Sequence, residues 1–118
     1  MLSLPELVRI YVCAQPTDMR KGFDSLAAVV RDWLGGDPLS GHLFVFRSRR
    51  GDRVKLLFWD QDGLVQYYKR LEKGFFRFPR ASDPETRSIE VSVQELSLVL
   101  WGIDPTSVKR QARYQHAG

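Results

Sequence analysis

The sequence predicts a single α+β domain, in which an antiparallel β-sheet of about five strands packs against one long and one short helix. Short apolar runs alternate with turn residues between residues 41 and 79. Helical apolar periodicity follows Thr17 and again Ser92. A chain of 118 residues is long enough for one hydrophobic core. We therefore assign residues 1–105 to this domain and residues 106–118 to a polar, flexible tail.

The N-terminal third predicts a strand followed by the long helix. Apolar and polar side chains alternate over Leu7–Cys13, which is typical of a strand. Pro16 ends this run, because the residue before a proline is disfavoured in helical geometry. Thr17 is a suitable N-cap for a helix over Asp18–Leu34, whose apolar residues recur every three or four positions. Gly35–Gly36 is expected to end this helix.

The remaining strands are separated by turns rich in glycine and aspartate. They are expected at His42–Arg47, Arg53–Trp59, Leu64–Leu71, a short edge strand Phe75–Phe78, and Ser88–Val91. Ser48–Asp52 and Asp60–Gly63 have the composition of hairpin turns. Ser92 and Glu95 form a capping box, which predicts the short helix at Val93–Trp101.

The composition argues against several functional classes. A single cysteine, Cys13, excludes an intrachain disulfide, and its apolar surroundings predict an unreactive buried thiol in a cytoplasmic protein. With His42 and His116 as the only histidines, a zinc site of the usual spacing is not expected. We find no secretory leader and no run long enough to span a membrane. The sequence therefore predicts no metal, no cofactor and no membrane partner.

Positive charge is concentrated in one segment. The net charge is +4, yet residues 47–80 contain 10 Lys and Arg against 4 Asp and Glu. The segments on either side are slightly acidic. Segregation of this kind is the pattern expected of a protein that binds a polyanion. The simpler alternative is the solvated face of a sheet, which also favours lysine and arginine.

Arginine binds phosphate through two parallel hydrogen bonds and also stacks on bases. The candidate nucleic-acid-binding residues are Arg47, Arg49, Arg50, Arg53, Lys55, Tyr68, Lys69, Arg70 and Lys73. Tyr68 or Trp59 is the expected stacking residue. Phe75 and Arg77 belong to the same mixture of aromatic and basic residues, but the phenylalanines are better explained as core.

An enzymatic alternative depends on three acidic residues. Asp18, Asp60 and Asp62 could serve a metal-dependent nuclease if their carboxylates converged on two cations. Asp60 and Asp62 also match the start of a calcium loop, but its remaining ligands are absent. Aspartate beside a strand end is more commonly part of a turn. We therefore predict no catalytic residue and no enzyme activity.

Five segments then carry a family resemblance. They are Pro16–Phe23 (PTDMRKGF), Gly41–Phe46 (GHLFVF), Arg53–Leu57 (RVKLL), Trp59–Asp60 and Tyr68–Gly74 (YKRLEKG). In this order they resemble the TnpB accessory proteins of the insertion-sequence sixty-six family of bacterial transposable elements, over about residues 7–102. Nothing in length or motif resembles the RNA-guided nucleases that share the name. The resemblance implies a role in transposition beside a separate transposase. The family has no agreed catalytic residues that could be assigned to positions of this sequence.

Three hypotheses follow from these observations. The favoured one is a non-catalytic DNA-binding accessory protein, with DNA, including the ends of the element, and the transposase of the same element as partners. The second is a protein-interaction module that docks the transposase without touching DNA, through an exposed aromatic edge and the Val93–Trp101 helix. The third is the nuclease that uses Asp60 and Asp62.

Overall fold

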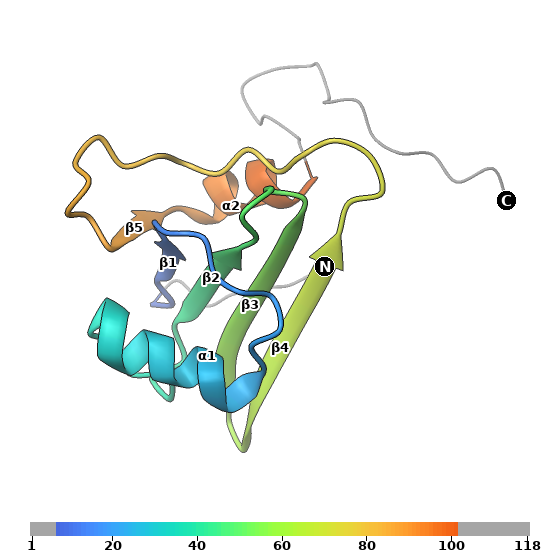
Figure 1. Cartoon of the computed structure of the whole chain (residues 1–118). Helices are drawn as coiled ribbons and strands as arrows, with labels where there is room; N and C mark the ends of the chain where they lie inside the picture. The colour runs from blue at the N-terminus through green and yellow to red at the C-terminus, as the bar shows by residue number, and fades with distance from the viewer. Residues whose placement is uncertain (1–6, 102–118) are drawn as a thin grey trace, which may run out of the picture.

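The computed structural model describes residues 7–101, which form one five-stranded sheet with a helix on each face (Figure 1). The elements are β1 (Ile10–Cys13), α1 (Phe23–Val29), the π-helix η1 (Val30–Leu34), β2 (Leu43–Arg47), β3 (Arg53–Asp60), β4 (Gly63–Arg70), β5 (Ser88–Val91) and α2 (Val93–Trp101). The predicted α+β class, with one long and one short helix, is confirmed. The expectation for residues 106–118 lies outside the described residues.

The sheet is mixed rather than wholly antiparallel. Its strand order is β4-β3-β2-β1-β5. β1 runs parallel to β2, with Ile10 opposite Leu43, and the other three pairs are antiparallel. The parallel pair arises because α1 crosses over one face of the sheet between β1 and β2, which returns the chain in the same direction.

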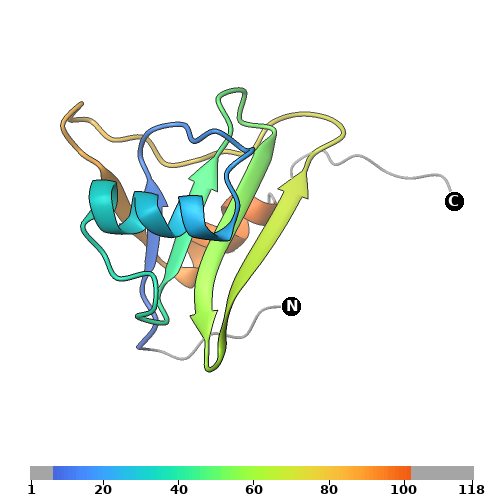
Figure 2. The ribbon, with the colours of Figure 1, turned by 60° about the horizontal axis from the view of Figure 1, so that its bottom comes forward.

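Each face of the sheet carries its own hydrophobic cluster. On one face, Leu26 of α1 and Val30 of η1 pack with Phe44 and other sheet residues. On the other face, Leu96 of α2 packs with Val45 and its neighbours. Figure 2 shows α1 in front of the sheet and α2 behind it. The continuous apolar run of β2 is therefore covered on both faces. No helix within residues 7–101 is long and apolar enough to span a membrane.

The long helix begins at Phe23, five residues later than predicted. The Asp18 carboxylate accepts hydrogen bonds from the backbone N–H and guanidinium of Arg20, which holds this segment in a turn. The buried ammonium of Lys55 donates hydrogen bonds to the carbonyls of Met19 and Lys21, at 2.7 and 2.8 Å. Thr17 is therefore not the N-cap, because the carbonyls that would begin the helix are used by a side chain from the sheet.

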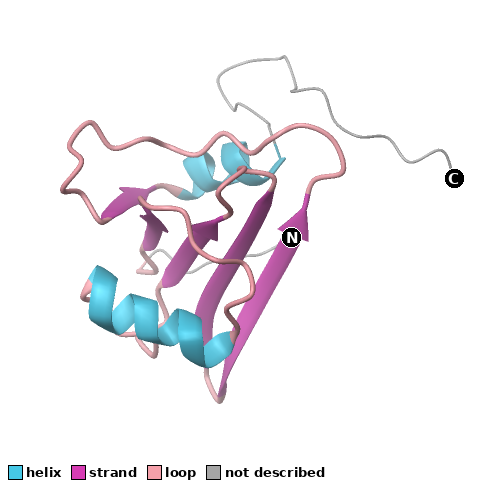
Figure 3. Cartoon of the chain, in the orientation of Figure 1, coloured by secondary structure: helices cyan, strands magenta, loops and turns pink. Residues whose placement is uncertain are grey.

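The predicted edge strand Phe75–Phe78 is absent. Residues 71–87 instead form a long loop between β4 and β5, drawn in pink in Figure 3. Phe76 is buried and packs against Phe78, with ring centroids 5.7 Å apart. The aromatic run therefore anchors a loop to the α2 side of the core, and the interpretation of its apolar composition as a strand is wrong.

Two local predictions about helix ends are confirmed. Gly35 adopts φ = 70°, the left-handed geometry of a helix C-cap. The Ser92 hydroxyl accepts from the Glu95 N–H at 3.1 Å, and the Glu95 carboxylate accepts from the Ser92 N–H at 3.0 Å. This reciprocal pair is the capping box that the sequence predicted at the start of α2.

Replacement of Lys55 tests its structural role. Lys55→Met should lower the free energy of unfolding by about 2 kcal/mol, because two carbonyls lose their buried donor. Chemical denaturation followed by tryptophan fluorescence measures this change. Arg49→Met is the matched control, because Arg49 is exposed and makes no hydrogen bond within residues 7–101. Equal effects of the two substitutions would contradict the assignment.

Candidate nucleic-acid interface

The site is built on the tip of the β2–β3 hairpin. The buried Ser48 hydroxyl accepts from the N–H groups of Gly51 and Arg53, at 3.2 and 3.0 Å. It also donates to the Asp52 carboxylate at 3.2 Å. Gly51 has φ = 81°, a conformation that other residues rarely adopt. One serine side chain and one glycine therefore give the tip a defined shape.

This tip holds the long loop that follows β4. The carbonyl of Asp52 accepts from the Leu71 N–H at 2.8 Å, and the carbonyl of Gly51 accepts from the Phe76 N–H at 2.8 Å. A third bond runs from the Thr17 N–H to the Arg47 carbonyl at 2.8 Å, at the end of β2. Segments far apart in the sequence are thus fixed around the hairpin.

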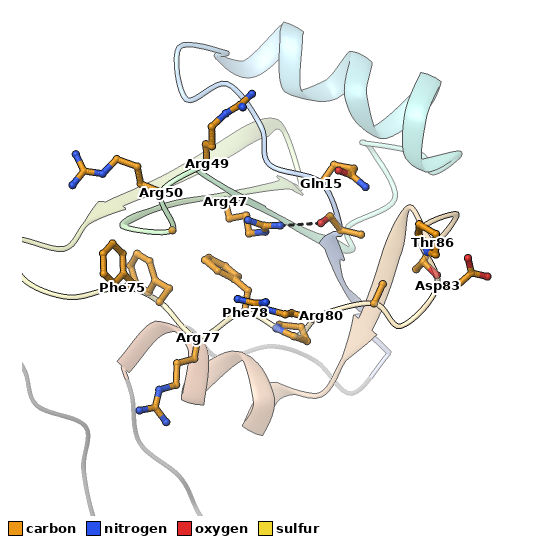
Figure 4. Close-up of a pocket in the computed structure, with 16 residues that line it drawn as sticks. Gln15, Arg47, Arg49, Arg50, Phe75, Arg77, Phe78, Arg80, Asp83 and Thr86 are labelled. Atoms are coloured by element: carbon orange, nitrogen blue, oxygen red, sulfur yellow. Dashed lines mark hydrogen bonds between the residues drawn. The ribbon is translucent and has the colours of Figure 1, made fainter.

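A hollow of about 780 Å³ lies between the hairpin tip and this loop (Figure 4). We call it the arginine hollow, and its defining residues are Arg47, Arg49, Arg50, Arg77 and Arg80 with Phe75 and Phe78. The only acidic residue that lines it within residues 7–101 is Asp83. The Asp83 carboxylate already accepts from the Glu85 N–H at 2.9 Å. The hollow is therefore strongly cationic.

Most of these arginines have no partner in the described part of the chain. Arg49, Arg50, Arg77 and Arg80 are exposed and make no hydrogen bond or ion pair there. Arg47 is half-buried and donates to the Ala14 carbonyl at 3.2 Å. Figure 4 shows Arg47 and Arg80 turned into the hollow, with Arg49, Arg50 and Arg77 extending outward from its rim. Guanidinium groups thus surround an open space.

A smaller hollow of about 470 Å³ lies on the other side of the tip and shares Arg49 and Arg50. Its far wall is the segment 16–20 that precedes α1. There the Arg20 side chain binds Asp18 at 2.7 Å and holds the pKa of that carboxyl well below its usual range. Because Asp18 neutralises the charge of Arg20, this hollow is less cationic than the arginine hollow.

Arg53, Tyr68 and Lys55 form a connected group beside the smaller hollow. Arg53 donates to the Tyr68 hydroxyl at 3.2 Å. The Lys55 ammonium lies 4.5 Å from the centre of the Tyr68 ring. Lys55 is buried at 5% exposure and its ammonium faces two carbonyls, so it supports this surface from below rather than extending it.

The other cations of the predicted set are dispersed. Lys69 donates to the Leu100 carbonyl at the end of α2, at 3.1 Å, and so lies on the opposite face of the sheet from Lys55. Arg70 is exposed and forms an ion pair with Glu72 at 2.9 Å. Lys73 is exposed in the turn after β4. The structure therefore does not bring these three side chains into the arginine hollow.

Trp59, Asp60 and Asp62 lie far from both hollows. Trp59 and Asp60 end β3, roughly 20 Å along the strand from Arg53. Asp60 pairs with Gly63 in the hairpin turn, with Asp62 between them. Within residues 7–101, no group of three His, Cys, Asp or Glu side chains is placed to hold a metal ion. His42 accepts from the Arg9 N–H at 3.0 Å, a structural contact.

Sequence reasoning missed part of the site. Arg77 and Arg80 lie within the basic segment, and Arg77 belongs to its mixture of aromatic and basic residues, but neither is in the predicted nucleic-acid-binding set. The sequence favours a core position for Phe75, yet its side chain is 62% exposed at the rim of the arginine hollow. The excess of positive charge over residues 47–80 was the available signal, since it extends to Arg80.

One comparison with known proteins identifies a family. The family model described as IS66 Orf2 like protein matches residues 8–110. Two uncharacterized proteins of Sinorhizobium fredii, y4jC and y4hO, are 41% and 42% identical over 104 residues. Each alignment covers 88% of this chain and 86% or 88% of the relative. No solved structure matches.

The contrast between Lys69 and Lys73 can be tested directly. Lys69→Met should lower the free energy of unfolding by about 1 kcal/mol, because the carbonyl end of α2 loses a cationic donor. Lys73→Met removes the same charge from an exposed turn and should leave stability unchanged. Urea denaturation of both variants measures the difference. A larger loss for Lys73→Met would contradict the structural role of Lys69.

Proposed function

This chain belongs to the IS66 Orf2 like family of transposition accessory proteins, and we propose that it serves transposition by binding DNA through the arginine hollow. The arginines attract the phosphates of the DNA electrostatically. The protein binds the DNA without catalysing a reaction on it. The transposase of the same element supplies the chemistry. DNA at the ends of the element is the natural target for such an accessory protein.

The observation that supports DNA binding most directly is the arginine hollow. Five arginines line one open surface, and the one acidic residue described there, Asp83, is engaged by a backbone N–H. Clustered guanidinium groups without counter-charges repel one another, and phosphates relieve that repulsion while accepting paired hydrogen bonds. A nucleic-acid backbone supplies phosphates at regular spacing, and each one neutralised releases counterions.

The proposed set of DNA-contacting residues differs from the one expected from the sequence. Arg49 and Arg50 stay in it as exposed residues of the hairpin tip, and Arg47 remains as the half-buried wall of the hollow. Arg77 and Arg80 join from the loop after β4. The set is therefore assembled from two segments, whereas the ammonium groups of Lys55 and Lys69 bind backbone carbonyls within the fold.

A second candidate function, docking of the transposase, is favoured by the free edge of β4. In the described part of the chain, β4 pairs only with β3, and Val65 and Tyr67 are exposed beside its open edge. Such an edge can accept a strand from a partner. The α2 helix contributes less to this candidate, since Leu96, Val99 and Leu100 are buried in the chain's own core.

The DNA-binding proposal is tested by fluorescence anisotropy over a range of salt concentrations, with duplexes of element-end and random sequence. Replacing Arg50 and Arg80 together by Gln should reduce the slope of log affinity against log salt by about 2, one for each phosphate that is no longer neutralised. The matched control is the double replacement of Arg31 and Lys73 by Gln. It removes the same charge from exposed positions that line neither hollow.

The outcomes separate the two candidate functions. A larger decrease in affinity for the Arg50 and Arg80 variant than for its control supports binding at the arginine hollow. Absence of DNA binding by the wild type at low salt would refute the DNA-binding proposal. In that case, loss of binding to the purified transposase on Tyr67→Lys would favour docking through β4 instead.

A further inference from the structure

Phe75 is exposed in a way that the fold does not require. At 62% exposure it is the most exposed aromatic side chain within residues 7–101. Its neighbour Phe76 is 7% exposed and supplies the apolar anchor for this part of the loop. A large apolar side chain left in water next to a cationic hollow is characteristic of a binding surface rather than of a core.

The position of Phe75 is fixed by the hairpin tip. The Phe76 N–H binds the Gly51 carbonyl at 2.8 Å, which secures the residue that follows Phe75. A Cβ placed on Gly51 would lie 4.0 Å from the Cβ of Phe75, so the two backbones are close neighbours. The ring is therefore presented from a held segment, and less conformational entropy is lost when a ligand covers it.

The surroundings of Phe75 match one class of ligand. Arg50 and Arg77 flank it at the rim of the arginine hollow, and Figure 4 shows the ring on the same side as Arg50. Aromatic rings among cations bind single-stranded nucleic acids, because a base stacks on the ring while arginines hold the phosphates on either side. The hollow, at about 780 Å³, lies within the range of small-ligand pockets and has room for one nucleotide.

Duplex DNA has to unstack or flip out a base before it can use this feature. Its bases are stacked on one another and present their edges in the grooves, so a base face reaches a protein ring only at a cost of about a few kcal/mol. We infer that the arginine hollow takes single-stranded DNA, with one unpaired base stacked on Phe75. This inference rests on the proposed DNA-binding function and adds to it a preference for strand state.

The experiment compares a short single strand with the duplex of the same sequence, using the full chain. Phe75→Ala should weaken binding of the single strand about tenfold and leave duplex binding unchanged. Phe75→Tyr keeps an aromatic ring and should restore single-strand affinity. Phe23→Ala is the matched control, because Phe23 is also exposed but lines neither hollow.

A spectroscopic signal reports stacking directly. A single strand that contains 2-aminopurine should lose fluorescence on binding the wild type, since stacking quenches this base. The quenching should be absent with Phe75→Ala at saturating protein and present with Phe75→Tyr. These results would support the stacking assignment independently of affinity.

Several outcomes would overturn the inference. Equal weakening of single-strand and duplex binding by Phe75→Ala would show that the ring has no role in strand preference, while DNA binding itself would stand. Tighter binding of an RNA strand than of the DNA strand would refute the assignment to DNA. Equal competition by polyglutamate would show that charge alone is recognised. No DNA binding by the wild type would remove both this inference and the proposed function.

Discussion

The shape of the arginine hollow depends on hydrogen bonds to the backbone carbonyls at the β2–β3 hairpin tip. Those of Arg47, Gly51 and Asp52 each accept an N–H from a segment outside the sheet. The tip itself is ordered by the Ser48 hydroxyl and by a left-handed glycine. Loops are normally variable, but these are positioned by a rigid scaffold, as binding loops usually are. The arginine hollow forms because these loops are held around the same hairpin tip.

Two groups of basic residues have different roles. Lys55 and Lys69 place their ammonium groups on backbone carbonyls and so connect the sheet to the segment before α1 and to the end of α2. Arg49, Arg50 and Arg80 have no such contact within residues 7–101. Unsatisfied like charges destabilise a compact fold, so the stability of the fold does not explain their convergence.

Two predictions that depended on neighbouring residues succeeded. The capping box of Ser92 and Glu95 and the left-handed Gly35 are both determined within a few residues of chain. Two errors in the placement of elements concern segments where a distant group replaced the local preference. The helix start moved to Phe23 because a side chain from β3 took its first carbonyls, and the aromatic run near Phe76 became a loop anchored to the hairpin.

The sequence by itself determined the α+β class, most of the elements and the concentration of positive charge in residues 47–80. Only the tertiary structure decided that β1 and β2 run parallel, that Lys55 is buried, and that Phe75 lies exposed beside the arginines. The physical reason is separation along the chain. The Lys55 bond to Met19 spans 36 residues, and no local pattern encodes which cations will be engaged by such distant carbonyls.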